Sequence, residues 1–114
     1  MALTIAEEQR DGVTVLKLTG RLVLGEESNE LRTTIKRLLD AGDNKILVDL
    51  NGVSYIDSAG LGTLVAGFTS SRNAGGTMKL ANLTKKVNEQ LNITKLVTVF
   101  DVFDNVAAGL KSFS

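Results

Sequence analysis

The chain has 114 residues, of which 43% are hydrophobic and 23% are charged. That length and apolar content fit one compact domain covering residues 1–114 and leave no room for a second. The 13 basic and 13 acidic residues cancel, so the overall field attracts neither a nucleic-acid backbone nor an anionic membrane, and no nucleic-acid partner is expected.

Cysteine and histidine are both absent. Their absence excludes disulfides, thiolate chemistry, Ser-His-Asp and Cys-His hydrolysis and ordinary zinc sites, so no metal or cofactor is predicted. The opening MALTIAEEQRDG lacks the basic start and apolar run of a secretory signal, and no apolar stretch approaches membrane-spanning length. We therefore expect a cytoplasmic protein that does not insert into a membrane.

Two antiparallel strands are predicted at the start of the chain. Leu3 and Ile5 alternate with polar residues, and after the turn signal Asp11-Gly12 the segment 13–19 is rich in β-branched and apolar residues. Gly20 then interrupts the pattern, which predicts a short third strand from Arg21 to Leu24.

An amphipathic helix is predicted from Glu26 onward. Ser28 is the candidate N-cap, the acidic residues near it suit the positive end of the helix dipole, and Gly42 suits the far end. Apolar residues recur at helical spacing on one face, namely Leu31, Ile35, Leu38 and Leu39.

The rest of the chain alternates between strand and helix patterns. Lys45 to Leu50 is a nearly continuous apolar run, typical of a central strand, and a second helix follows Ser58 and ends near Gly75-Gly76. The later predicted elements are a strand from Met78 to Leu83, a helix capped by Thr84, a short strand from Val97 to Phe100 and a final helix carrying Val106, Ala107 and Leu110. This order predicts an α/β fold: a mixed sheet with an antiparallel start and a parallel centre, with helices packed against it.

The segment from Ile56 to Gly62, between the central strand and the second helix, is the candidate functional site. The first N–H groups of a helix lack internal partners, and Asp57 and Ser58 are both residue types that accept such hydrogen bonds. In the simplest interpretation one of them is a cap, and the glycines that follow permit close packing of helix and sheet.

A second interpretation makes Ser58 a regulatory phosphorylation site. Its hydroxyl would lie at a helix N-terminus, which tolerates an added anion, whereas Asp57 beside it would repel the phosphate. A phosphate of about −1.5 to −2 charge would also lose its water in any contact surface. The modification should therefore break an interface and leave the fold intact.

Nucleotide binding and a receiver-type site fit less well. The glycines at 60, 62, 75 and 76 form neither the Gly-x-Gly-x-x-Gly fingerprint nor a P-loop with its lysine. A phosphoaspartate or metal site at Asp49 and Asp57 would need an acidic pair after the first strand, which the opening of the chain does not supply. The preferred account of these two residues is solvated carboxylates at strand ends.

Acid–base catalysis is a third alternative. Lys79, Asp49 and Tyr55 carry the right groups, but nothing in the sequence places them together, and no paired-carboxylate or metal spacing supports them. The chain is therefore not expected to be an enzyme.

The strand 46–50 followed by VSYIDSAGLG at 53–62 resembles the signature of STAS domains, specifically of bacterial anti-sigma factor antagonists. The resemblance extends to LTGRL at 18–22 and KLANL at 79–83, so it covers nearly the whole chain. It implies a single STAS-like domain without catalytic activity that is a monomer when free.

The resemblance also implies a mechanism and a site. A partner that is both an ATP-dependent serine kinase and an anti-sigma factor would bind the unphosphorylated chain and release its sigma factor. Phosphorylation of Ser58 would block binding, and a PP2C-type phosphatase would reset the cycle. The implied partner-binding residues are Asp57, Ser58, Ala59, Gly60, Leu61, Gly62, Gly25 and Glu26.

Two positions depart from the family pattern. Many relatives carry Asp where this chain has Val23, at a position that can face the kinase, and Ser or Thr where it has Ala59, which leaves Ser58 the sole candidate phosphoacceptor in the turn. An alternative function is a non-switching STAS scaffold in a stress-signalling assembly, or a small soluble subunit of a lipid-transport complex. In that case Ser58 would be only a cap.

Overall fold

The computed structural model describes residues 3–114 and contains a five-stranded sheet in the order β1-β2-β3-β4-β5. The strands are β1 (Leu3–Arg10), β2 (Val13–Leu22), β3 (Lys45–Ile56), β4 (Thr77–Ala81) and β5 (Val102–Phe103). The helices are α1 (Glu26–Asp40), α2 (Ser58–Asn73), α3 (Lys85–Ile93) and α4 (Val106–Lys111), with a 3₁₀ turn, η1 (Leu96–Thr98), between α3 and β5. Strands β1 and β2 pair antiparallel and the later pairings are parallel, which confirms the predicted α/β fold with a mixed sheet.

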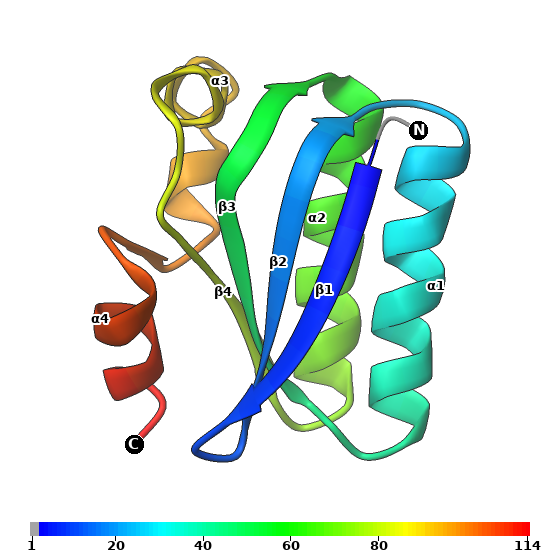
Figure 1. Ribbon diagram of the computed structural model, residues 1–114, viewed down its shortest axis with the longest axis vertical. Helices are drawn as coiled ribbons and strands as arrows, with labels where there is room; N and C mark the ends of the chain where they lie inside the picture. Colours follow the sequence, from blue (N-terminus) through cyan, green and yellow to red (C-terminus); the bar gives the residue numbers. More distant parts are fainter. Residues whose placement is uncertain (1–2) are drawn as a thin grey trace.

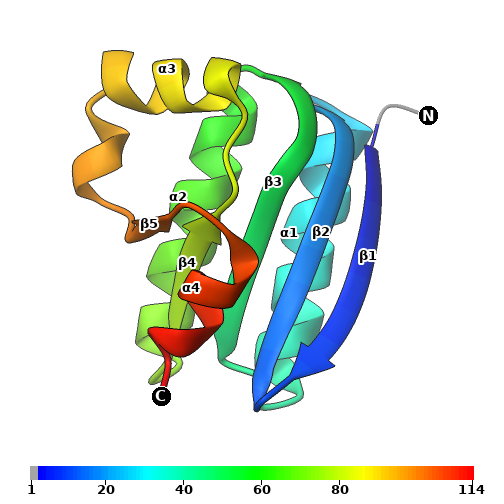
Figure 2. The ribbon, with the colours of Figure 1, turned by 60° about the vertical axis from the view of Figure 1, so that its left-hand side comes forward.

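Helices cover both faces of the sheet. Helices α1 and α2 lie side by side against one face, and α4 packs against the other (Figures 1 and 2). The larger core cluster includes Leu18 of β2, Leu31 of α1 and Leu64 of α2, and a smaller cluster joins Leu47 of β3 to Leu110 of α4. Helix α3 lies across the end of the sheet at which β3 finishes (Figure 2).

Strand β3 is longer than its apolar run predicts. It pairs with both neighbours as far as Asp49 and then, from Gly52 to Ile56, with β2 alone. Gly52 permits this continuation, because a Cβ there would lie only 2.7 Å from the carbonyl oxygen of Leu18. The last residues of β3 therefore project beyond β4 and carry the chain into the candidate site.

The predicted third strand, Arg21 to Leu24, is wrong because β2 continues without a break to Leu22. Gly20, which suggested the break, has a φ of 117° and remains paired with Val53 of β3. The pairing register shifts on either side of this glycine. Gly20 therefore bends a continuous strand, as glycines at β-bulges do, and does not end it.

The start of α1 also differs from the prediction. Ser28 is not its N-cap: this serine is buried, and its hydroxyl donates to the carbonyl oxygen of Val23 at 2.7 Å. The N-cap is Gly25, with a φ of 112° that glycine adopts readily. For α3 the predicted cap is confirmed, since Thr84 Oγ1 accepts a hydrogen bond from the N–H of Val87 at 3.3 Å.

The predicted strand from Val97 to Phe100 is wrong. The chain turns through Lys95, at a φ of 66°, into the 3₁₀ turn η1, and the last strand, β5, comes later. Phe100 is buried, and its ring centroid lies 5.5 Å from that of Phe68 in α2. Its apolar character thus reflects packing in the core and not a place in the sheet. The predicted final helix is confirmed as α4.

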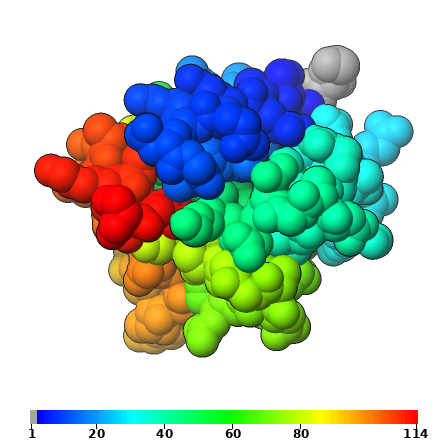
Figure 3. Space-filling view, turned by 90° about the horizontal axis from the view of Figure 1, so that it is seen from below, coloured from blue at the N-terminus to red at the C-terminus, as the bar shows by residue number. Residues whose placement is uncertain are grey.

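The hairpin between β1 and β2 and the entry into the candidate site lie at opposite ends of the sheet. Figure 3 shows the end at which β1 turns into β2, where this hairpin lies beside the C-terminal segment. The opposite end holds the last residues of β2 and β3 and the first turns of α1 and α2 (Figure 1). Within residues 3–114, no helix combines the length and apolar composition needed to cross a bilayer.

Candidate functional site

The candidate site lies where β3 enters α2. Ile56, the last residue of β3, is buried and anchors the turn in the core. Asp57 follows in an extended conformation as the N-cap of α2, and Ser58 is the first helical residue. Of the two capping candidates from the sequence, Asp57 is therefore the cap, which leaves the Ser58 hydroxyl free of that role.

Asp57 connects two separate segments through its carboxylate. Oδ1 accepts a hydrogen bond from the N–H of Gly60 at 2.9 Å, which caps α2, and Oδ2 accepts one from the N–H of Leu24 at 3.0 Å. Burial alone would raise the pKa of Asp57, but these backbone donors favour the charged form and hold its pKa below the ordinary value. The carboxylate thus fixes the β2–α1 loop beside the first turn of α2.

Ser58 is accessible for modification. Its side chain is exposed on the first turn of α2. Among the hydrogen bonds of residues 3–114, none uses its Oγ. An added phosphate would lie at the positive end of the α2 dipole, which favours an anion. Both the exposure of Ser58 and its place at a helix N-terminus are compatible with a phosphate there.

The predicted partner-binding residues of the turn differ in their exposure to solvent. Gly60 and Leu61 are beneath the surface: a Cβ at Gly60 would lie 2.2 Å from the carbonyl oxygen of Leu22, and Leu61 is only 5% exposed. Ala59 is half-buried and Gly62 is exposed, with no atom within 4 Å of the place a Cβ would occupy. Packing therefore explains the glycine at 60 and does not explain the glycine at 62.

The β2–α1 loop brings the other predicted residues to the same place. Gly25 and Glu26 are both exposed, and they follow Leu24, whose N–H is bound by Asp57. The prediction did not include Leu24, whose side chain is 76% exposed. The only signal in the sequence was a large apolar residue directly before a glycine. The name Ser58 surface is used below for the exposed and half-buried members of this group: Leu24, Gly25, Glu26, Asp57, Ser58, Ala59 and Gly62.

The structure does not support the alternative acid–base or metal sites. Asp49 is 7% exposed, which makes the predicted solvated carboxylate wrong for this residue; it accepts hydrogen bonds from Asn51 N–H at 3.0 Å and Asn82 Nδ2 at 3.3 Å. Lys79 lies on the neighbouring strand β4 but donates to Ser112, with its ammonium 4.5 Å from the ring centroid of Phe113. Asp49 and Lys79 thus each have their own hydrogen-bond partners, and no hydrogen bond or ion pair joins them among the described residues. In the described part of the chain, no three His, Cys, Asp or Glu side chains are grouped closely enough to hold a metal ion.

The fold and the turn identify the family. A family model described as the STAS domain matches residues 4–109, and the chain belongs to that family. It is 32% identical over 81 residues to the anti-sigma-B factor antagonist of Bacillus subtilis strain 168, covering 71% of this chain and 73% of that protein.

Two solved structures show the same fold. The first is an anti-sigma factor antagonist from Mycobacterium paratuberculosis, with a TM-score of 0.85 at 19% identity over 98% of this chain and 94% of that one. The second is the Bacillus cell fate determinant SpoIIAA in its phosphorylated form, with a TM-score of 0.76 at 16% identity over 97% of this chain and all of that one. The resemblance noted in the sequence is thereby confirmed at the level of family and fold.

Proposed function

We propose that this protein is an anti-sigma factor antagonist whose binding to its partner is controlled by phosphorylation of Ser58. The main support for the proposal is that Asp57 and Ser58, although adjacent in the turn, have different roles. Asp57 provides the cap and the connection to the β2–α1 loop, whereas the neighbouring serine is exposed with its hydroxyl unused. A serine with no structural task at the centre of a fixed surface suits a switch.

The proposed partner is an anti-sigma factor that is also a serine kinase. The names of the curated relatives support an anti-sigma factor as the target, and a structural neighbour solved in a phosphorylated form supports covalent control. In the proposed cycle, the unphosphorylated chain binds the kinase in the cytoplasm as a monomer and displaces the sigma factor. A PP2C-type phosphatase then reverses the phosphorylation.

Local electrostatics explain why phosphorylation would block binding. The phosphate would stand beside the Asp57 carboxylate, which its lowered pKa keeps charged, and would have to be desolvated inside the contact. A penalty of about 3 kcal/mol is enough to weaken binding more than a hundredfold. The chain needs no catalytic group of its own for this task.

Exposed residues beside Ser58 support a contact surface. Leu24 is a large apolar side chain left in solvent, and Gly62 is an exposed helical position without any side chain. Glycine inside a helix costs about 0.5–1 kcal/mol relative to alanine, and no packing contact in the fold requires it here. A partner backbone that approaches closely over Gly62 would explain the residue.

Capture from a native lysate tests the proposal. Wild type, Ser58→Ala and Ser58→Glu are used as baits, and the recovered kinase is purified and incubated with each bait and ATP. We expect wild type and Ser58→Ala to retain the same kinase and Ser58→Glu to lose it. Intact-mass analysis should then show one added phosphate on wild type and none on Ser58→Ala.

Ser70 supplies the matched control, since it is an exposed serine on the same helix but near its other end. Ser70→Glu should retain the kinase as wild type does. Equal retention by Ser58→Glu, or phosphate addition to Ser58→Ala, would contradict the switch. Constitutive association with membrane subunits, independent of Ser58, would favour the non-switching scaffold.

A further inference from the structure

An aromatic residue flanked by two cations lies at the same end of the molecule as Ser58. Tyr55 of β3 is 39% exposed. The guanidinium carbon of Arg21 lies 5.9 Å from its ring centroid, and the ammonium of Lys86 lies 5.8 Å from the same centroid. These three residues come from β2, β3 and α3 and are called the Tyr55 cluster below.

The fold holds the cluster in place. Arg21 and Tyr55 are direct partners in the parallel pairing of β2 with β3, just after the register shift at Gly20. Thr84 Oγ1 donates to the carbonyl oxygen of Val53 at 3.2 Å, which anchors the start of α3 to β3 two residues before Tyr55. Lys86 therefore approaches the ring from a helix whose N-terminus is fixed to the same strand.

Neither cation of the cluster has a carboxylate partner. The ion pairs among residues 3–114 join Arg10 to Glu8, Lys36 to Asp40 and Arg37 to Glu7, so Arg21 and Lys86 take part in none of them. The hydroxyl of Tyr55 is likewise absent from the hydrogen bonds of the described residues. Three donor groups thus lie around one exposed ring without an acceptor among the described residues.

The position of Lys86 does not serve the stability of α3. Helix α3 begins with Lys85 and Lys86 and has no acidic residue in its first turn. Cations at a helix N-terminus oppose the helix dipole, so this placement is unfavourable for the isolated fold. The contact between Lys86 and the Tyr55 ring contributes about 0.5–1 kcal/mol, as exposed cation–π contacts do, and the unfavourable dipole interaction is of similar size, about 0.3–1 kcal/mol, so the lysine adds little net stability to the fold.

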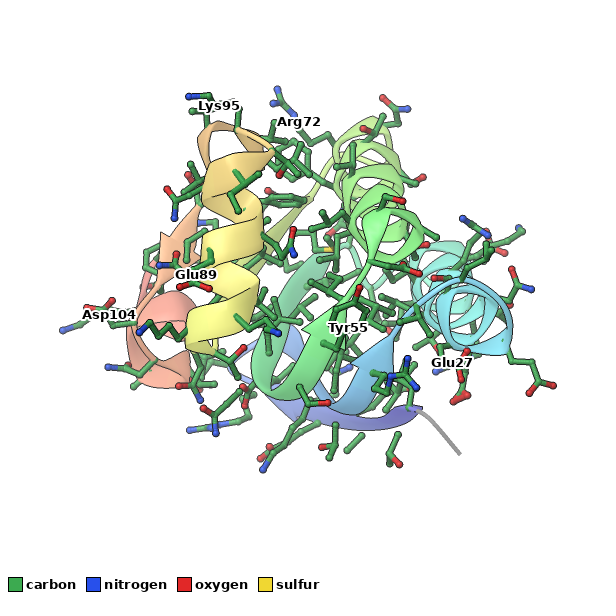
Figure 4. All side chains as sticks on the ribbon, turned by 90° about the horizontal axis from the view of Figure 1, so that it is seen from above. Glu27, Tyr55, Arg72, Glu89, Lys95 and Asp104 are labelled. Atoms are coloured by element: carbon green, nitrogen blue, oxygen red, sulfur yellow. The ribbon has the colours of Figure 1, made fainter. Side chains whose placement is uncertain are left out.

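Charge is divided across this end of the molecule. The first turn of α1 carries Glu26 and Glu27, whereas the Tyr55 cluster and the start of α3 are basic. Figure 4 looks down on this end and places Tyr55 between Glu27 of α1 and α3, which carries Glu89. Ser58 is the first residue of α2, and this helix begins at the same end of the molecule (Figure 1). A protein that covers the Ser58 surface therefore meets negative charge on one side and positive charge on the other.

We infer that the Tyr55 cluster is a docking subsite for acidic side chains of the partner protein. Acidic side chains bound there would accept hydrogen bonds from the guanidinium of Arg21, the ammonium of Lys86 and the phenol of Tyr55. The subsite and the acidic start of α1 together fix the orientation in which the partner lies over Ser58. This inference rests on the proposed function for the partner's identity and not for the chemistry of the subsite.

The chain contains a built-in probe for a test that needs no partner. Tyr55 is its single tyrosine and tryptophan is absent, so intrinsic fluorescence reports on this subsite alone. A capped tetraglutamate peptide is titrated into the protein at low ionic strength. We expect a saturable decrease in tyrosine emission, reversed by added salt and absent in the Arg21→Gln/Lys86→Gln double variant. Lys36→Gln, which removes a cation from α1, is the control and should respond as wild type does.

Three results would overturn the inference. They are an unchanged emission, an equal response in the double variant, and a response to inorganic phosphate with none to the peptide. With the partner kinase, the double variant should bind about tenfold more weakly and with a shallower salt dependence, and unchanged affinity would overturn it as well. Failure of the Ser58 switch appears separately, as equal binding of phosphorylated and unphosphorylated protein, and leaves the peptide titration unaffected.

Discussion

The carboxylate of Asp57 accepts a hydrogen bond from the backbone N–H of Leu24 at 3.0 Å, although the two residues are 33 positions apart. The other oxygen of the same carboxylate caps α2 through Gly60. One side chain thus holds together the two segments that make up the Ser58 surface. The positions of the residues in the Ser58 surface therefore depend on Asp57, whether or not a partner contacts Asp57 itself.

Removal of the Asp57 carboxylate should destabilise the fold. Asp57→Ala loses both backbone hydrogen bonds, and we expect a decrease of about 1–2 kcal/mol in the free energy of unfolding, measured by urea denaturation. Asp57→Asn should cost less, because asparagine is a good N-cap but has a single carbonyl oxygen for two donors. Asp43→Ala, at an exposed position without an ion pair among the described residues, is the control.

The contribution of Asp57 to stability should depend on pH. Its pKa is lower in the folded state than its ordinary value, so the charged form stabilises the fold above about pH 4 and this contribution disappears as the pH falls through the lowered pKa. The difference in unfolding free energy between wild type and Asp57→Ala should be constant near neutral pH and shrink in acid. A difference that grows as the pH falls would contradict the assigned direction of the pKa shift.

Gly60 and Gly62 should respond oppositely to the same substitution. Gly60→Ala forces a Cβ against the carbonyl oxygen of Leu22 and should destabilise the protein by about 1–3 kcal/mol. Gly62→Ala meets no atom within 4 Å and should stabilise it by about 0.5–1 kcal/mol, because alanine suits a helix better. If a partner approaches over Gly62, this more stable variant will nevertheless bind the kinase more weakly; unchanged affinity would remove Gly62 from the contact.

Leu24 should matter for binding and not for folding. Its side chain is 76% exposed, so Leu24→Ala should leave the melting temperature unchanged and weaken kinase binding about tenfold, as loss of a buried apolar contact does. Ile93 is a matched control with 74% exposure at the end of α3. Ile93→Ala should bind normally, and an equal loss of affinity in both variants would show that the contact is not centred on Ser58.

Local sequence patterns were enough to predict most of the fold. The helical spacing of Leu31, Ile35 and Leu38 predicted α1, and these residues are buried as expected. The predicted strand at 97–100 failed because apolar residues in a short segment do not distinguish a sheet position from packing against α2. The predicted break at Gly20 failed because a glycine can bend a strand or end it, and only its pairing with β3 decides which.

The candidate site was predicted less completely than the fold. The turn at 57–62 was identifiable because its residue types suit a helix start. The contact between Asp57 and Leu24 and the approach of Lys86 to Tyr55 depend on strand register and on the anchoring of α3, which no local pattern contains. Exposed apolar residues such as Leu24 become recognisable only when burial of their neighbours is known.

Genuine Ser58 phosphoprotein, prepared by incorporating phosphoserine at that position, gives the sharpest test of the switch. Its affinity for the purified partner kinase is measured by calorimetry beside that of the unmodified chain. We expect phosphorylation to weaken binding more than about a hundredfold, while the two proteins melt at the same temperature. Equal affinity of both forms would contradict the switch.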